Sequence, residues 1–374
     1  MISSARRINE YRIMGKSILL WAGYHDSKWD IKDWIDQGMG GSEYCLIKLA
    51  YHLKNKGYDV TVGGDVKPGW WEGVNWGILN KKHYDIVIAN NYIHFIKHLE
   101  DEGINFDKAY FWMHNEDYYN SYNGGELPNY KSYFKHPKFQ KVIGVSKIHA
   151  DKLKENAEDI FDYTKDEAER YIDHIDNAID LEDYKEIKKV DKTPGRIIWT
   201  SSSDRGLNTI LENWTSWKLQ RPDLSLVICS PPYAEDWFDK NKIKTLKDVE
   251  WIGPQNPIDL KNEIAKSEYW VYLSDYFETY CISVLEMMMG EVKIITTGPG
   301  NIMVLIDKGN RGTLLNTLYE SRITPNEAIQ IMVKDIKDKS YNKILNNKVL
   351  RANQWAQKQN WESRIDEWCK MLTN

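Results

Sequence analysis

The fold is decided by residues 40–62, which read GGSEYCLIKLAYHLKNKGYDVTV. Apolar side chains recur in this stretch at helical spacing, and Lys56-Gly57 ends the pattern as a helix C-cap does. The apolar runs Ser17–Ala22 before it and Tyr58–Val62 after it predict buried strands. A strand, a helix and a second strand in this order indicate a parallel sheet that is covered by helices on both faces.

The alternation of short apolar runs and amphipathic stretches continues along the chain and then starts a second time. A charged stretch, Leu181–Gly195, ends in Pro-Gly and separates the two series, as an interdomain linker does. We therefore predict an α/β protein with a leader at residues 1–15 and two Rossmann-like, doubly wound domains at 16–183 and 184–355. The remaining strands are predicted at residues 86–89, 109–113 and 142–145, and then at 196–199, 224–229, 249–252, 269–273 and 293–296.

The end of the chain predicts one more helix, at residues 356–374. Trp361, Ile365, Trp368 and Leu372 recur at the spacing of one helical face and form an apolar stripe. Two tryptophans on a terminal helix need a large surface to pack on. From the pattern alone, the first and the second domain are equally suitable surfaces.

Composition argues against several classes of protein. The 374 residues carry 50 Lys and Arg against 55 Asp and Glu, a net charge of −5, whereas a non-specific nucleic-acid binder normally carries a basic surface. No apolar run approaches the ~18–20 residues that span a bilayer, and the first residues lack the apolar core of a secretory signal. The four cysteines are far apart and show no CxxC or Cys/His ligand spacing, which predicts reduced thiols. We expect a cytoplasmic protein (in the host cytoplasm if the gene is viral), and peripheral contact with a membrane stays open.

A glycine-rich turn, GMGGSE at Gly38–Glu43, is a candidate anion site. Gly40 and Gly41 directly precede the predicted helix, where backbone N–H groups and the helix dipole favour negative charge. The alternative is a tight turn that merely needs small residues.

A serine-rich turn in WTSSSDRGLNTILENW, Trp199–Trp214, is a second candidate anion site. It lies between a predicted strand and a predicted helix, and Ser202 and Arg205 offer a hydroxyl and a guanidinium there. The alternative is ordinary helix capping with a solvated Arg205.

Two glutamates are spaced along DYFETYCISVLEMMMG, the segment Asp275–Gly290. Glu278 lies at the junction of a strand and a predicted helix, and Glu286 lies two turns further on. If both were helical, their backbones would be about 12 Å apart, whereas the carboxyls of a glycosidase pair are roughly 5–9.5 Å apart. The longer separation suits a ligand with two ends, such as a ribose and a sugar. Capping and surface glutamates are the alternative.

A histidine follows the apolar strand in YFWMHNED, residues 110–117. His114 comes just after the strand, and open α/β sheets bind ligands at the carboxyl ends of their strands. A lone histidine is still more often structural than catalytic.

In this order the motifs resemble those of the family 4 glycosyltransferases, which have the GT-B fold, from about Lys16 to the end of the chain. The most specific match is the Glu-x7-Glu element, formed by Glu278 and Glu286. The other matches are Gly40-Gly41 with the run to Tyr58-Asp59-Val60, Val145-Ser146, Asp176-Asn177-Ala178-Ile179-Asp180 and Ser202-Ser203-Asp204-Arg205-Gly206-Leu207. The resemblance implies two domains that face each other across a cleft and a C-terminal helix that crosses back to the first domain.

The resemblance also implies residue roles. The catalytic residues would be Glu278 and His114 beside the donor sugar, and Arg205, which would neutralise the leaving diphosphate. Glu286 would accept hydrogen bonds from the ribose hydroxyls. The remaining donor-binding groups would be Gly40, Gly41, Ser202 and the backbone near Thr279.

On this basis we expect a retaining glycosyltransferase of the hexosyltransferase type, which moves a sugar from a nucleotide-diphosphate sugar to a glycan, a lipid or a protein-linked glycan. We expect no cofactor and no metal site, because the chain has no Asp-x-Asp triplet and no zinc-ligand spacing. A nucleotide-sugar epimerase or hydrolase of the same fold and a non-catalytic nucleotide- or glycan-binding protein stay open. The chain departs from the family pattern at Gly298-Pro299-Gly300-Asn301, which replaces Gly-Gly-x-x-Glu, and shows no second phosphate-binding cation.

Overall fold

The computed structural model describes residues 15–373 except 24–26, 117–120, 123–124, 127–129, 186, 188–189, 232–237 and 316–324. The chain forms two compact units. The first unit consists of the chain up to Lys32, Gly41–Ala178 and Trp361–Asn374, and the second consists of Asp33–Gly40 and Ile179–Asn360. The chain first passes from one unit to the other within helix α2 (Ile31–Gln37), between Lys32 and Asp33.

The first unit is built on an 8-stranded sheet. Its strands lie in the order β10 (Ile172–His174), β9 (Phe139–Gly144), β6 (Asn105–Met113), β5 (His83–Asn90), β1 (Ser17–Trp21), β2 (Asp59–Gly63), β4 (Val74–Trp76) and β3 (Gly69–Trp71). Neighbours are parallel except for the antiparallel pair β3 and β4. This confirms the predicted parallel sheet. The short strands β3, β4 and β10 were not predicted, because runs of three residues are too short to show a period.

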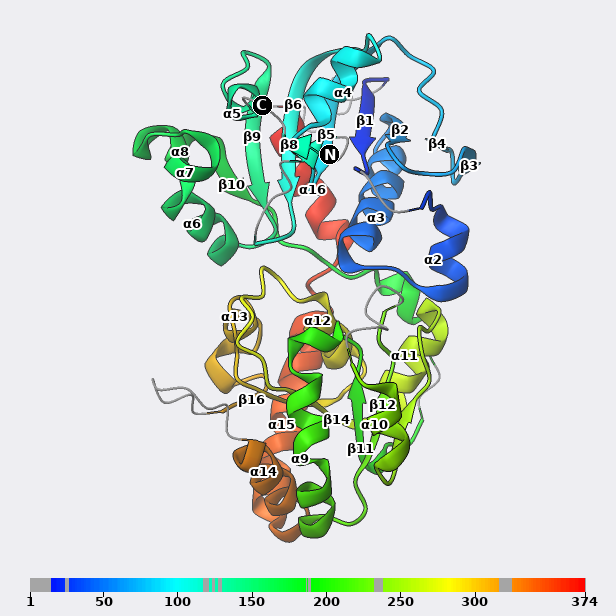
Figure 1. Ribbon diagram of the computed structural model, residues 1–374, viewed down its shortest axis with the longest axis vertical. Helices are drawn as coiled ribbons and strands as arrows, with labels where there is room; N and C mark the ends of the chain where they lie inside the picture. The colour runs from blue at the N-terminus through cyan, green and yellow to red at the C-terminus, as the bar shows by residue number, and fades with distance from the viewer. Residues whose placement is uncertain are drawn as a thin grey trace, which may run out of the picture. The chain divides into compact units, whose positions relative to one another are not determined.

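Helices and short strands complete the first unit (Figure 1). They are α3 (Gly41–Asn55), α4 (Phe95–Asp101), β7 (Ser121–Tyr122), β8 (Gly125–Glu126), α5 (Lys131–Phe134), α6 (Lys147–Glu155), α7 (Ala157–Phe161), α8 (Lys165–Tyr171) and α16 (Trp361–Thr373). Helix α3 buries the apolar stripe that predicted it, including Leu46, Leu49 and Leu53. Helix α6 begins where the Ser146 side chain accepts a hydrogen bond from the His149 backbone N–H.

The C-terminal helix α16 belongs to the first unit. It packs beside α3, and its apolar stripe, Trp361, Ile365, Trp368 and Leu372, is buried. The Trp368 ring meets the Trp112 ring edge to face at 5.0 Å, and the Tyr110 hydroxyl donates to the Met371 carbonyl at 3.3 Å. The chain therefore crosses back after the second unit, as the resemblance implied, and the first unit is complete only with its last residues.

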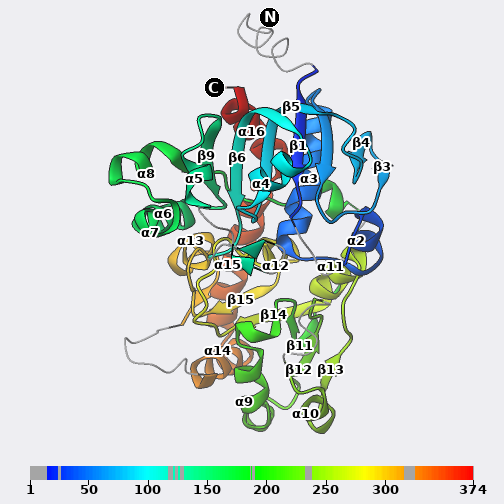
Figure 2. The same ribbon diagram turned by 45° about the horizontal axis from the view of Figure 1, so that its top comes forward.

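The second unit is built on a 6-stranded, fully parallel sheet (Figure 2). Its strands lie in the order β13 (Val249–Trp251), β12 (Ser225–Ile228), β11 (Thr193–Trp199), β14 (Ser267–Tyr272), β15 (Lys293–Thr296) and β16 (Thr313–Leu314). Its helices are α9 (Leu207–Gln220), α10 (Lys240–Thr245), α11 (Pro257–Lys266), α12 (Ile282–Met289), α13 (Ile302–Leu305), α14 (Pro325–Lys337) and α15 (Lys339–Ala356), with 3-10 turns at Leu181–Tyr184, Ser203–Arg205 and Asp307–Gly309. The second series of predicted strands is thus confirmed as a second parallel sheet.

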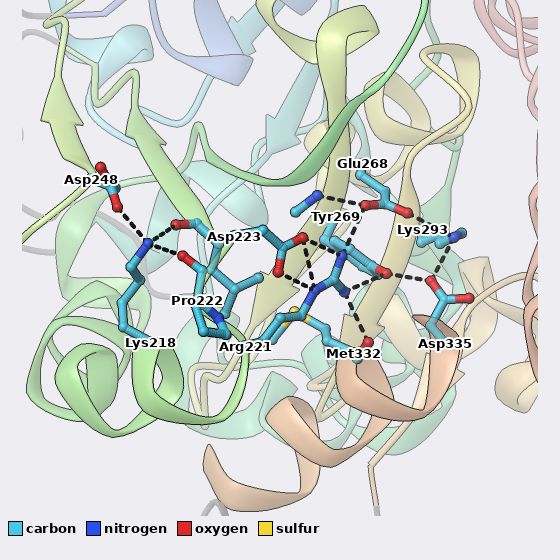
Figure 3. Close-up of polar contacts among 12 residues, drawn as sticks. Lys218, Arg221, Pro222, Asp223, Asp248, Glu268, Tyr269, Lys293, Met332 and Asp335 are labelled. Atoms are coloured by element: carbon cyan, nitrogen blue, oxygen red, sulfur yellow. Dashed lines mark hydrogen bonds and ion pairs between the residues drawn. The ribbon is translucent and has the colours of Figure 1, made fainter. Parts of the chain in front are cut away.

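A buried network of charges joins α14 to this sheet (Figure 3). The Arg221 side chain is fully buried and donates to the Tyr269 hydroxyl and to the Met332 carbonyl, both at 2.8 Å. Asp335, on α14, accepts hydrogen bonds from the Tyr269 hydroxyl and from Lys293 Nζ. Glu268 pairs with Lys293 at 3.0 Å and with Arg221 at 3.4 Å. Each buried charge therefore has an opposite partner, which offsets the cost of removing it from water.

Candidate active site

The candidate active site of the second unit lies where β14 ends and the chain passes to α12. Glu278 is in the loop between the two elements, because α12 begins only at Ile282. The eight-residue helical spacing considered for Glu278 and Glu286 therefore does not apply, and only Glu286 is helical. The residue before α12, Cys281, has a φ of 71°, a left-handed conformation that side chains rarely adopt. This kink separates the Glu278 loop from the helix.

The Glu278 loop is held in place by the loop that follows β15. The Asn301 backbone N–H donates to the Glu278 carbonyl at 2.8 Å. A Cβ on Gly300 would lie 2.4 Å from the same carbonyl oxygen, and Gly300 has a φ of +56°. Only glycine allows so close an approach of the two backbones. Gly298-Pro299-Gly300-Asn301, which departs from the family pattern in sequence, thus fixes the backbone of Glu278.

The serine-rich turn approaches the same strand end. It forms the 3-10 turn Ser203–Arg205 followed by Gly206, whose φ is +108°. A Cβ on Gly206 would lie 2.1 Å from the Leu273 carbonyl oxygen, so only glycine lets this turn reach the end of β14. Ser202 is buried beside it, and within the described part of the chain its Oγ has no hydrogen-bond partner.

Arg205 and Glu278 are brought together by these two turns. Arg205 Nη1 lies 3.4 Å from Glu278 Oε1, and the guanidinium stacks on the Tyr276 ring, 3.1 Å from its centroid. The Tyr272 hydroxyl also donates to Glu278 Oε1. Burial raises the pKa of Glu278, while Tyr272 and Arg205 act to lower it, and the net shift is upward. Arg205 is therefore not a solvated surface residue but part of a partly buried ion pair.

Glu286 lies in the middle of α12 and is partly exposed. Within the described residues no group donates a hydrogen bond to its carboxylate. Burial raises the pKa of Glu286, the positive charge of Lys261 lowers it, and Asp183 raises it. A carboxylate with this surrounding can accept hydrogen bonds from a ligand. Glu286 therefore differs from a solvated surface glutamate, because burial raises the pKa of its carboxyl group.

Lys261 is a charged residue of this site that the sequence did not reveal. It lies on α11, its side chain is buried, and its Nζ is 5.3 Å from the centroid of the Tyr184 ring. In the sequence it is one lysine of an amphipathic helix, and no local pattern distinguishes it from a solvated one. Its position near Glu286 depends on the packing of α11 against α12.

The N-terminus of α12 has no side-chain cap among the described residues. Its first backbone N–H groups follow Thr279, Tyr280 and Cys281 directly in the sequence. Uncapped N–H groups and the helix dipole together favour an anion at such an end. Within the second unit, Arg205, Glu278 and the N-terminus of α12 therefore belong to one candidate site, and Thr279 lies in the loop between Glu278 and the helix.

The remaining predicted residues are divided between the units. Gly40 ends the segment Asp33–Gly40 of the second unit, and Gly41 begins α3 of the first. In the same turn, Gly38 has a φ of +73°, and a Cβ there would lie 2.6 Å from the Gln255 carbonyl oxygen. At Gly38 the glycine is therefore required by backbone packing.

His114 lies in the first unit, at the carboxyl end of β6, and is buried. Its backbone N–H donates to Asn91 Oδ1 at 2.7 Å, and its ring packs on Trp112 at 4.3 Å. Burial, with a smaller contribution from His149, lowers the pKa of His114 to about 3. The imidazole is therefore neutral at neutral pH and can donate or accept a hydrogen bond without carrying charge.

None of the helices in the described part of the chain is both long and apolar enough to cross a membrane. Among the same residues, no group of three or more His, Cys, Asp or Glu side chains could hold a metal ion.

A family model matches part of the second unit. Residues 182–347 match the family model described as "Glycosyl transferases group 1". No curated protein sequence matches the chain. The match covers β11 to most of α15 and includes Arg205, Glu278 and Glu286.

Solved structures share the fold over nearly the whole chain. A glycosyltransferase from Rickettsia africae superposes with a TM-score of 0.67 at 14% identity, over 96% of this chain and 98% of that one. HepE from Anabaena, in complex with UDP and glucose, gives a TM-score of 0.66 at 14% identity, over 96% and 99%. A sucrose-phosphate synthase from Thermosynechococcus elongatus gives 0.65 at 13% identity, over 95% and 98%.

Identities this low establish the shared fold, while the family match rests on the sequence of the second unit. Two parallel-sheet units, a C-terminal helix that returns to the first unit and the Glu278–Glu286 element all agree with it. Residues 182–347 therefore match the glycosyl transferases group 1 family, and the chain as a whole has the GT-B fold of the solved glycosyltransferases.

Proposed function

We propose that the protein is a retaining, metal-independent glycosyltransferase that moves a hexose from a nucleoside-diphosphate sugar to a glycan, lipid-linked or protein-linked acceptor. The observation that carries the proposal is the ion pair of Arg205 and Glu278, held by two glycine-dependent turns beside the uncapped N-terminus of α12. The group 1 family match covers these residues. The Anabaena neighbour of the same fold, solved with UDP and glucose, supports the choice of donor class.

Arg205 and α12 are suited to the diphosphate. During transfer, the bond between the sugar and the diphosphate breaks and negative charge develops on the leaving phosphate. A guanidinium binds two phosphate oxygens in a fixed geometry, and the α12 N–H groups add partial positive charge. The contact of Arg205 with Glu278 is long, at 3.4 Å, so phosphate oxygens can compete for the guanidinium. Such prearranged donors stabilise the transition state more than the ground state.

Glu286 and Lys261 are suited to the nucleoside. The Glu286 carboxylate has lone pairs for the two hydroxyls of a ribose. Lys261 lowers the pKa of Glu286 and so favours the ionised form, which is the stronger acceptor. Lys261 is also a candidate for the second cation that the sequence did not reveal.

His114 is suited to a sugar hydroxyl. Because its pKa is lowered to about 3, it binds as a neutral imidazole and adds no charge beside the leaving group. The first unit would bind the acceptor.

The proposal is tested by incubating the protein with a panel of nucleoside-diphosphate sugars, with and without oligosaccharide acceptors, after dialysis against EDTA. We expect acceptor-dependent release of nucleoside diphosphate and a product with the anomeric configuration of the donor. Rearrangement of the donor without an acceptor would indicate an epimerase, and binding without turnover a non-catalytic protein. Activity that returns only with Mg²⁺ or Mn²⁺ would contradict metal independence. The experiment is needed because a cation held by the phosphates of the donor requires few protein ligands.

Replacing Arg205 with alanine is expected to weaken binding of a nucleoside diphosphate roughly 10- to 100-fold, because a charge-assisted hydrogen bond is lost. Binding of the corresponding nucleoside should change little, since it lacks the phosphates. Isothermal titration calorimetry with both ligands measures the two effects. Arg311→Ala is a matched control, because Arg311 also stacks on an aromatic ring, Trp355, at 4.1 Å. Equal losses for nucleoside and diphosphate would show that Arg205 is only structural.

A further inference from the structure

Besides Arg205, a buried residue of the sheet, Tyr272, contacts Glu278. Tyr272 is the last residue of β14, and its side chain is fully buried. Its ring stacks on Trp270 at 4.7 Å and on Trp199 at 5.6 Å, with interplanar angles of 18° and 15°. The position of the ring is restricted by its stacking on the two tryptophans and by the strand that carries it. The hydroxyl is therefore fixed by the core of the second unit.

The Tyr272 hydroxyl and Arg205 both donate to the same oxygen of Glu278, Oε1. Within the described residues no group donates to the second oxygen, Oε2. The carboxylate is thus held through one oxygen, and its other oxygen is available to a ligand. The side chain as a whole is 14% exposed, so the ligand would meet it from one side.

We propose that Tyr272 is a positioning residue for Glu278: its hydroxyl holds Oε1, so that Oε2 is presented to the donor sugar. This rests on the proposed function, in which Glu278 lies beside the sugar. Arg205 alone would not suffice as an anchor, because it has to exchange Glu278 for the diphosphate when the donor binds. Tyr272 carries no charge and has no such competing partner, so its hydrogen bond persists through the reaction.

The hydrogen bond also affects the charge of the carboxylate. Besides Tyr272, the described ionisable groups that interact with Glu278 include Arg205 and Asp204 on the serine-rich turn and Cys281 in its own loop. Burial raises the pKa of Glu278, Tyr272 and Arg205 lower it, and Asp204 raises it. Removing the hydroxyl therefore raises the pKa further. If the ionised form is the active one, activity falls as the pH drops through this pKa, and the loss must begin at a higher pH in the variant.

The test is Tyr272→Phe, which keeps the ring and its stacking. We expect kcat to fall on the order of 10-fold or more, as for other hydrogen bonds to a charged group. We expect KM for the donor to change little and the acid limb of the pH profile to move to higher pH. Tyr269→Phe is the matched control: Tyr269 lies on the same strand, is equally buried and donates to a carboxylate, Asp335, outside the site. It should lower stability and leave kcat and the pH profile unchanged.

A second readout does not depend on turnover. The pKa of Glu278 can be followed by ¹³C NMR of protein with labelled glutamate, the signal being assigned by its loss in Glu278→Gln. We expect it to rise in Tyr272→Phe and to stay in Tyr269→Phe. An unchanged pKa in Tyr272→Phe overturns the inference whether or not the protein transfers sugar. A raised pKa with unchanged kcat would also overturn positioning, whereas a wild-type protein that turns over no donor would instead contradict the proposed function.

Discussion

Glu278→Gln is expected to lower kcat on the order of 100-fold or more, because electrostatic contacts made in the transition state typically contribute that much. The amide keeps the shape of the side chain but removes the negative charge beside Arg205 and Tyr272. Positive charge develops on the sugar during transfer, and the neutral amide stabilises it less. Donor affinity should change little, since the proposed function assigns the diphosphate to Arg205 and the nucleoside to Glu286. Steady-state kinetics over a range of donor concentrations separates the two effects.

Glu286→Ala is the matched control for this variant, on the same segment of chain. It removes the carboxylate proposed for the ribose, so it should raise KM for the donor and lower nucleotide affinity more than it lowers kcat. The two variants should therefore differ in kind. Wild-type turnover and affinity in both would refute the roles assigned to the Glu-x7-Glu element.

Deleting Trp361–Asn374 is expected to prevent stable folding of the first unit. The deletion removes a helix whose buried side chains include Trp361, Ile365, Trp368 and Leu372 and uncovers the surface they fill. A large-to-small substitution of one buried aromatic residue costs about 3–5 kcal/mol, and a whole domain is stable by only about 5–15 kcal/mol. Far-UV circular dichroism in urea should show that the transition of the first unit is lost. An unchanged urea transition in the truncated protein would refute a structural role for α16.

A graded version of this experiment uses Trp368→Ala. The Trp368 ring meets Trp112 at 5.0 Å and is buried, so the free energy of unfolding should fall by about 3–5 kcal/mol. Trp70→Ala is the control, because Trp70 is 67% exposed on the edge strand β3 of the same unit. It should change the free energy of unfolding by less than about 0.5 kcal/mol.

Local patterns were sufficient for the architecture. A run of apolar residues shows a strand, and a helical period shows which face of a helix is buried, because both depend on neighbours in the sequence. The two series of strands, the buried stripe of α3 and the stripe of α16 were therefore predictable. The stripe alone did not show on which unit α16 packs, and the family resemblance supplied that.

The candidate site was only partly predictable. The strand-to-helix junction identified Glu278 and Glu286, and the serine-rich turn identified Arg205. The loop conformation of Glu278 was not visible, because the left-handed Cys281 that directly precedes α12 has no local sequence signal when glycine is absent. Lys261 and Tyr184 come from elements that are distant in sequence, so their approach to Glu286 follows from the packing of α11 against α12.

The sequence by itself determined the class of fold, the number of parallel sheets and the residue types at the ends of their strands. Only the tertiary structure decided the partners of those residues: Tyr272 and Arg205 on one oxygen of Glu278, and Asn301 on its backbone. It also decided that Arg221, Lys293 and Asp335 are buried in one charge network and not solvated. The physical reason is that periodicity records which side of an element avoids water, whereas hydrogen bonds and ion pairs depend on a few ångströms between residues far apart in the chain.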